Sequence, residues 1–363
     1  MSGSGIRKVL AITAVLSSVA IFMANPAKAT SDHPDTLIFA PYKGQTYTLW
    51  SDGLVSTPAY VTAQQTFEGD FSGTPGRDLF LYTPGPAADG ILHITPTEPG
   101  ISPSFTPLFI IGNYKPLVGD FDGNGIDDIF WYAPGTAADS IWLFKADGTH
   151  VTKPFIVNGT YRPTVINVDG DGYDDIIWYG PGTAADSIWR FGPGASRTTK
   201  SVSISGDYQL IPGYFSLVAE GSPQQRLIFF AKAGPDSIWT FDISANHTSA
   251  PLPNIDGNFK PVVGNFLDGL IQQVLFYRPG PGSERFIGFT STGALNQYEA
   301  PNVSGNYDPA VGNFNGDGYD DIAWGFSGKA NLWYFNGSGY TTGFVSTLTP
   351  NTMPAVVHID SLS

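Results

Sequence analysis

Val118 to Trp142 reads VGDFDGNGIDDIFWYAPGTAADSIW. The first half of this stretch forms a short loop whose positions 1, 3, 5 and 9 are Asp120, Asp122, Asn124 and Asp128. Gly125 stands at position 6, where a sharp turn favours a residue that adopts a positive φ without strain. Oxygen ligands at alternate positions, completed by the carbonyl of Ile126, are what Ca2+ requires. The stretch therefore predicts a calcium-binding loop between two strands.

The same loop recurs twice more along the chain. One copy supplies Asn167, Asp169, Asp171 and Asp175, and the other supplies Asn313, Asn315, Asp317 and Asp321. An EF-hand begins with a similar pattern but needs Glu at position 12. That position is Trp131, Trp178 or Trp324 here, which excludes an EF-hand. We expect about three Ca2+ sites, with a mainly structural role for the metal.

The loops mark a repeat of about 47 residues. Each unit reads as four short apolar strands; in the second unit we expect them near residues 116–121, 129–132, 140–145 and 150–157. The 43 glycines and 29 prolines supply the many turns that such units need. Four-stranded sheets at this period predict an all-β fold, the β-propeller.

The two ends of the chain suggest how the ring closes. Residues 35–50 align with 128–142, and residues 353–360 align with 114–122. The N-terminal end would then supply three strands of one blade and the C-terminal end the fourth. Six whole units and this composite predict a seven-bladed propeller of four-stranded blades over residues 30–363.

The first 29 residues read as a secretory signal peptide. Arg7 and Lys8 precede an apolar run over residues 9–24, and Ala27-Lys28-Ala29 gives a cleavage site after Ala29. The alternative is a retained anchor helix, for which the run is short. We therefore expect a secreted, extracellular protein with no membrane span in the mature chain. The chain has no cysteine, so it has no disulfide framework.

The formal net charge of −14 argues against nucleic acid or an anionic membrane as a partner. Part of this acidity is gathered in the loops, where a cation would neutralise it. We expect a monomer.

The loops and their period resemble the FG-GAP/VCBS repeat family, which includes the seven-bladed propeller of integrin α-subunits. The resemblance spans nearly the whole mature chain and implies that the three loops bind Ca2+, with the carbonyls of Tyr173 and Tyr319 matching that of Ile126. The literal FG and GAP tripeptides are absent, and the segment after the second strand reads Y-x-P-G instead. Family members include adhesion proteins, lectins and some lyases, so the fold alone selects no function.

A second constellation falls on the face opposite the loops. Its carboxylates are Asp139, Asp186 and Asp236, and its aromatic residues are Tyr114, Tyr161 and Tyr208. An aromatic ring beside a carboxylate at each blade junction suits a sugar, through stacking and hydrogen bonds to hydroxyls. The alternative is structural: each Asp caps its own turn, and each Tyr wedges between blades.

Catalysis finds little support in the sequence. The five histidines occupy unrelated repeat positions, and there is no G-x-S-x-G motif. We expect a calcium-binding, non-catalytic binding module whose partner is an extracellular glycan or a cell-surface protein. The alternatives are a polysaccharide lyase or glycoside hydrolase on a propeller scaffold, and an envelope scaffold that binds only protein.

Overall fold

The computed structural model describes residues 36–41, 48–51, 54–56, 65–74, 77–86, 89–96, 101–182, 184–217, 223–267, 270–300, 302–326, 329–346 and 352–357. The predicted signal peptide lies outside these residues. Within them, every regular element is a β-strand except the short 3-10 helix η1 (Pro193–Ala195). The apolar segments are short and end at glycine- and proline-rich turns, so strands rather than helices form.

Six sheets are built from four consecutive strands each. They comprise β4 (Gln65–Gly69), β5 (Asp78–Tyr82), β6 (Asp89–Pro96) and β7 (Ile101–Leu108); β8 (Lys115–Gly119), β9 (Asp128–Tyr132), β10 (Asp139–Phe144) and β11 (His150–Phe155); β12 (Arg162–Ile166), β13 (Asp175–Tyr179), β14 (Asp186–Gly192) and β15 (Ser196–Val202); β16 (Tyr208–Leu217), β17 (Pro223–Ala231), β18 (Asp236–Phe241) and β19 (His247–Leu252); β20 (Lys260–Gly264), β21 (Gln273–Tyr277), β22 (Arg285–Phe289) and β23 (Leu295–Tyr298); and β24 (Asp308–Gly312), β25 (Asp321–Phe326), β26 (Lys329–Phe335) and β27 (Tyr340–Ser346). A further sheet has the order β28-β1-β2-β3 and contains β1 (Thr36–Pro41), β2 (Thr48–Ser51), β3 (Leu54–Ser56) and β28 (Thr352–Val357).

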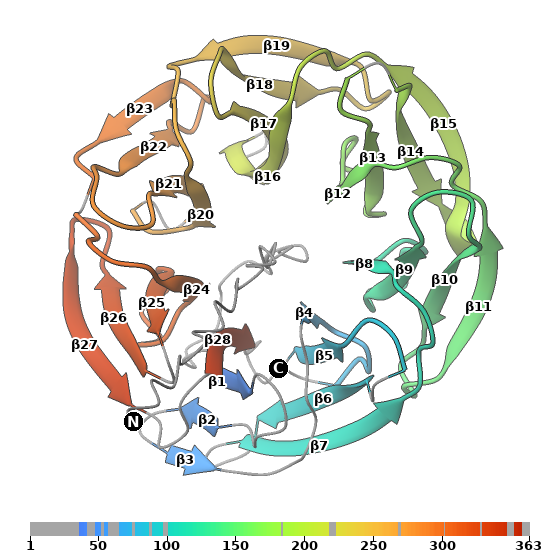
Figure 1. Ribbon diagram of the computed structural model, residues 1–363, viewed down its shortest axis with the longest axis horizontal. Helices are drawn as coiled ribbons and strands as arrows, with labels where there is room; N and C mark the ends of the chain where they lie inside the picture. The colour runs from blue at the N-terminus through green and yellow to red at the C-terminus, as the bar shows by residue number, and fades with distance from the viewer. Residues whose placement is uncertain are drawn as a thin grey trace, which may run out of the picture.

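The sheets stand around a common centre as the blades of a β-propeller (Figure 1). The first strand of each blade, such as β8, faces the centre, and the fourth, such as β11, lies at the rim. All pairings within the blades are antiparallel, and β8 pairs with β9 from Lys115–Tyr132 to Gly119–Asp128. The turn between the first and second strands therefore lies on one face of the ring, together with the turn between the third and fourth strands.

The expectation of a seven-bladed propeller requires correction. Six four-stranded blades, from β4–β7 to β24–β27, are formed by consecutive strands and are described together with their packed side chains. The sheet β28-β1-β2-β3 is instead assembled from segments at the two ends of the chain, with β1 pairing antiparallel with β28. Six blades, not seven equivalent ones, thus carry the described core and the sites discussed below.

The core lies between neighbouring blades. The second strands β5, β9, β13 and β21 are buried at every residue, because a sheet covers each of their faces. Trp131 on β9, for example, meets the rings of Phe80 and Tyr82 on β5 at centroid distances of 5.5 and 5.8 Å. Rigid aromatic packing of this kind fixes the strand ends from which the loops project.

Candidate metal centre

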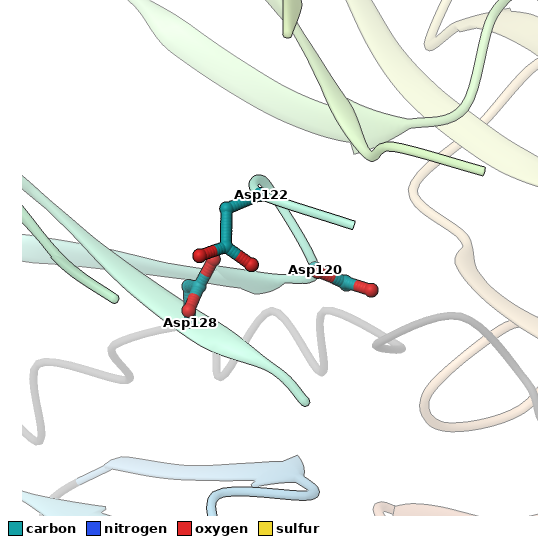
Figure 2. Close-up of side chains that lie close together, drawn as sticks. All are labelled: Asp120, Asp122 and Asp128. Atoms are coloured by element: carbon teal, nitrogen blue, oxygen red, sulfur yellow. The ribbon is translucent and has the colours of Figure 1, made fainter. Parts of the chain in front are cut away.

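The loop between β8 and β9 brings three carboxylates together. Ligand oxygens of Asp120, Asp122 and Asp128 all lie within 4.8 Å of one another. Figure 2 shows the carboxylates of Asp122 and Asp128 facing each other, with Asp120 beside them. Asp128 is the first residue of β9, so its position is set by the sheet, whereas the other two lie on the turn.

Backbone hydrogen bonds hold this turn in shape. The Asp120 carboxylate accepts the N–H groups of Gly123 at 2.7 Å and Gly125 at 2.8 Å. Gly125 has φ of +84°, a conformation that penalises a side chain, which explains the glycine at position 6. The Asp128 carboxylate accepts the N–H of Phe121 at 3.0 Å and, from the third strand, the N–H of Phe144 at 2.9 Å.

The electrostatics of the cluster favour a cation. Burial raises the pKa of Asp128 to about 8, and repulsion from Asp122 and Asp120 adds to the rise. Burial also raises the pKa of Asp120 and of Asp122. A divalent cation would remove this penalty, since it favours the charged form of all three groups. The oxygen-only donor set, with Asn124 and the carbonyl of Ile126 beside it, fits Ca2+ better than a softer metal.

The loop between β12 and β13 has the same turn, but one of its carboxylates forms an ion pair with an arginine. Asn167 Oδ1 accepts the N–H of Gly170 at 2.7 Å, and Asp171 Oδ1 accepts that of Tyr173 at 3.0 Å. Asp175 accepts two backbone N–H groups and has a pKa raised to about 8, chiefly by burial, like Asp128. Asp169, however, pairs with Arg190 of β14. The sequence analysis missed this arginine, and its place one residue after Trp189 was the available signal.

The loop between β24 and β25 is the least acidic of the three. Asn313 Oδ1 accepts the N–H of Asp317 at 3.1 Å, and Asn315 Nδ2 donates to Asp317 Oδ2 at 3.0 Å. Asp321 accepts the N–H groups of Phe314 and Phe335, and burial raises its pKa to about 8. The carbonyl of Tyr319 belongs to the same turn. All members of the predicted set are therefore brought to one short loop.

The residue at position 8, which the sequence analysis did not assign, ties neighbouring blades together. The Asp174 carboxylate accepts the backbone N–H of Asp120 in the preceding blade at 3.0 Å, and the N–H of Asp174 donates to the Asp120 carbonyl at 2.8 Å. The same side-chain contact recurs at the other blade junctions, where the acceptors are Asp127, Gln225, Gln272 and Asp320. Because Gln serves as well as Asp, this tie requires an acceptor rather than a charge.

On the opposite face, the predicted carboxylates are buried in their own turns. Asp139 accepts the N–H of Ala133 at 2.8 Å and that of Val157 at 2.6 Å. Asp186 and Asp236 make the equivalent pairs of bonds, and all three side chains are shielded from solvent. This geometry supports the structural alternative for the carboxylates, since none of their partners is a neighbouring tyrosine.

The tyrosines of that face lie partly exposed at the inner ends of the blade junctions. Tyr114, Tyr161 and Tyr208 pack edge-on against an aromatic residue of the second strand, as Tyr161 does against Trp178 at 5.9 Å. The backbone N–H of Tyr161 donates to the hydroxyl of Tyr132, which in turn donates to the Gly159 carbonyl. Equivalent bonds position Tyr114 and Tyr208. The tyrosines are therefore held rigidly, with one ring edge buried.

Comparison with known proteins places the chain among β-propellers. Residues 305–346 match the family model for the FG-GAP repeat, which confirms the resemblance for that blade. No curated protein sequence matches the chain. In the described ranges, no helix has the length and apolar character needed to cross a bilayer.

Solved structures that resemble the chain share its fold at low sequence identity. A lectin from Agrocybe aegerita that recognises non-reducing terminal N-acetylglucosamine aligns with a TM-score of 0.67 and 14% identity, over 89% of this chain and 95% of the lectin. A periplasmic gluconolactonase from Pseudomonas aeruginosa aligns with a TM-score of 0.57 and 12% identity, over 90% and 99%. A Lactobacillus plantarum protein gives 0.57 and 10%, over 89% and 98%. At these identities the similarity is one of fold.

Proposed function

We propose that this chain is a secreted, calcium-stabilised β-propeller that binds glycans without transforming them. The observation that carries the proposal is the repeated, partly exposed tyrosine at the blade junctions, in a fold shared with a lectin over nearly its whole length. The lectin's own ligand makes a terminal N-acetylamino sugar the first class to test. Calcium at the carboxylate loops would hold the opposite face in shape rather than contact the sugar.

The junction around Tyr161 has the features of a sugar subsite. Tyr161 is partly exposed, and the residues of the preceding turn of its blade junction, Thr136 to Ala138, are small and exposed. Lys115 lies close, because its Nζ donates to the Tyr161 carbonyl at 3.3 Å. Arg162 pairs with Asp207 on the other side. A flat ring between polar groups can stack on a pyranose while neighbouring side chains bind its hydroxyls.

The buried carboxylates weigh on the choice between binding and catalysis. A glycosidase needs two carboxyl groups that reach one substrate. Asp139, Asp186 and Asp236 are each buried and bound to two backbone N–H groups of their own blade, so these three do not face one substrate as a pair. The non-catalytic function is therefore favoured on this face.

A glycan array that includes terminal N-acetylglucosamine, probed with calcium-loaded protein, tests the proposal. We expect binding to a restricted set of glycans and a loss of about tenfold in affinity for Tyr161→Ala, the factor that 1.4 kcal/mol represents. Phe344→Ala is the matched control, because Phe344 is an aromatic residue 58% exposed on the rim strand β27. Folded protein that binds no glycan on the array would contradict glycan binding, and steady turnover of a polysaccharide would contradict a non-catalytic function.

A further inference from the structure

In several blades, one position on the third strand faces the loop between the first and second strands. It lies four residues after the buried carboxylate near the start of that strand, and in the β12–β15 blade, counted from Asp186, it is Arg190. In the β4–β7 blade it is His93, whose Nδ1 lies 3.1 Å from Asp78 Oδ1. In the β20–β23 blade it is Gly288, where an added Cβ would come within 2.7 Å of Gln273 Cγ. The contacts show that this position, which we call the loop-facing position, lies against position 9 or position 3 of the loop.

Arg190 fills the place that a cation would take in the loop of its blade. Its Nε donates to Asp169 Oδ2 at 2.5 Å, and its Nη2 donates to the same oxygen and to the Ile243 carbonyl at 3.3 Å. The Asp169 side chain is only 1% exposed. A buried carboxylate is costly unless it is paired or hydrogen-bonded, and the guanidinium supplies both a charge and N–H donors from within the chain.

The loop of the β8–β11 blade has the same acidic positions and a different loop-facing residue. Asp122 stands at position 3, as Asp169 does, but the third strand offers Leu143. Leu143 brings no charge and packs against the apolar core. Among the described residues, Asp120, Asp122 and Asp128 make up a group of three acids close enough to share an ion, whereas Asp169, Asp171 and Asp175 do not.

We infer that Arg190 is a built-in counter-ion that replaces calcium in the Asn167 loop, so that this loop binds no metal. The inference refines the calcium part of the proposed function and rests on it only for the identity of the competing ion. The guanidinium of Arg190 binds Asp169 Oδ2, the oxygen that would otherwise coordinate the metal. The apolar Leu143 leaves the corresponding oxygen of Asp122 free for a cation.

Three further blades can be compared at the loop-facing position. His93 stands beside an acidic loop residue, Asp78, in the β4–β7 blade. Where position 9 is the neutral Gln273, the loop-facing residue is Gly288 and carries no charge. Tyr334, the counterpart in the β24–β27 blade, is also uncharged, so its acidic loop is left for an external ion. In the β8–β11 and β12–β15 blades, the loop-facing residue therefore decides whether the carboxylate at position 3 meets a guanidinium or is left for an external cation.

Exchanging the two residues tests the inference with Ca2+ alone as the probe. Native mass spectrometry counts bound ions, and isothermal titration measures their affinity. We expect Arg190→Leu to bind one more Ca2+ than the wild type and to gain a calcium-dependent rise in melting temperature. We expect Leu143→Arg to bind one fewer. Arg190→Gln provides a second variant that keeps a polar side chain should the leucine disturb the fold.

Arg197→Leu is the matched control, because Arg197 lies over the Trp189 ring on the same blade and makes its contacts away from the loop. It should leave the ion count unchanged. Folded Arg190 variants that bind no more ions than the wild type would overturn the inference, whatever the wild-type count is. A wild type that binds no Ca2+, with an Arg190 variant that binds one, would instead refute calcium at the Asp120 and Asn313 loops and leave the inference standing.

Discussion

The loop at Asp120–Asp128 and the loop at Asn265–Gln273 occupy the same place in two blades. They differ at positions 1, 3 and 9, where Asn265, Leu267 and Gln273 stand in place of the three aspartates. In the first, Asp128 accepts the N–H groups of Phe121 and Phe144. In the second, Gln273 Oε1 accepts those of Phe266 and Leu267, and its Nε2 donates to the Ile271 carbonyl. A neutral amide thus closes the turn without any cation. The turn itself therefore does not require carboxylates. The carboxylates of the acidic loops are explained better by cation binding than by the shape of the turn.

The largest loss of stability should come from removing the side chain at loop position 9. Asp128→Ala would leave two buried N–H groups without an acceptor, which costs on the order of 3 kcal/mol in the free energy of unfolding. Gln273→Ala should destabilise by a similar amount. The two variants should differ in calcium response, because Asp128→Ala alone loses a metal ligand. Thermal unfolding with Ca2+ and with EDTA measures both the loss of stability and the calcium-dependent rise in melting temperature. If the two variants respond equally to calcium, Asp128 is not a metal ligand.

A medium effect is expected from pH in the metal-free protein. The pKa values of Asp128, Asp175 and Asp321 are raised from 3.8 to about 8, chiefly by burial. A raised pKa in the folded state means that folding favours the protonated form, so this stability is complete below about pH 4 and is lost as the pH rises through about 8. The melting temperature in EDTA should therefore be lower at pH 8 than at pH 5.

Calcium should oppose this loss, because it binds the ionised carboxylates. At a hundredfold excess over its Kd, one ion adds about 2.7 kcal/mol, or on the order of 5 °C for a chain of this size. The gain on adding Ca2+ should therefore be larger at pH 8 than at pH 5. A calcium effect that shrinks with rising pH would contradict the assignment of the carboxylates as ligands.

The smallest effect should come from the tie at position 8. Asp174→Asn keeps an acceptor for the Asp120 N–H, just as the uncharged Gln272 serves the Tyr214 N–H. We expect a change below about 1 kcal/mol, whereas Asp174→Ala should cost about 1 to 3 kcal/mol. Urea unfolding of both variants shows whether the hydrogen-bond acceptor or the negative charge of Asp174 stabilises the fold. A large loss of unfolding free energy in Asp174→Asn would show that the charge is required.

The sequence predicted the strands and the loops more completely than the side-chain contacts. The strands found at Lys115–Gly119, Asp128–Tyr132, Asp139–Phe144 and His150–Phe155 lie close to the expected ranges, because the first three are rich in apolar residues and a hairpin turn at residues 146–148 precedes the fourth. The pairing of Arg190 with Asp169 was not predictable from the loop motif. It depends on which face of the third strand meets the loop, a matter of register that the repeat alone does not reveal.

The same limit applies to the opposite face. The aromatic and acidic residues recur in register, as a binding site would require, yet the structure separates them: Asp139 is buried in its turn while Tyr161 remains partly exposed. A carboxylate that caps a turn and one that binds a ligand have the same sequence signature. Only the hydrogen-bond partners distinguish them.

Anomalous diffraction from crystals grown with Ca2+ tests the central claim most directly, because it locates each ion in the ring. The account predicts a peak within the Asp120–Asp128 loop and one in the Asn313–Asp321 loop, with none in the Asn167–Asp175 loop or in the Asn265–Gln273 loop. A fully occupied ion beside Asp169, or an Asp120 loop without one, would contradict it.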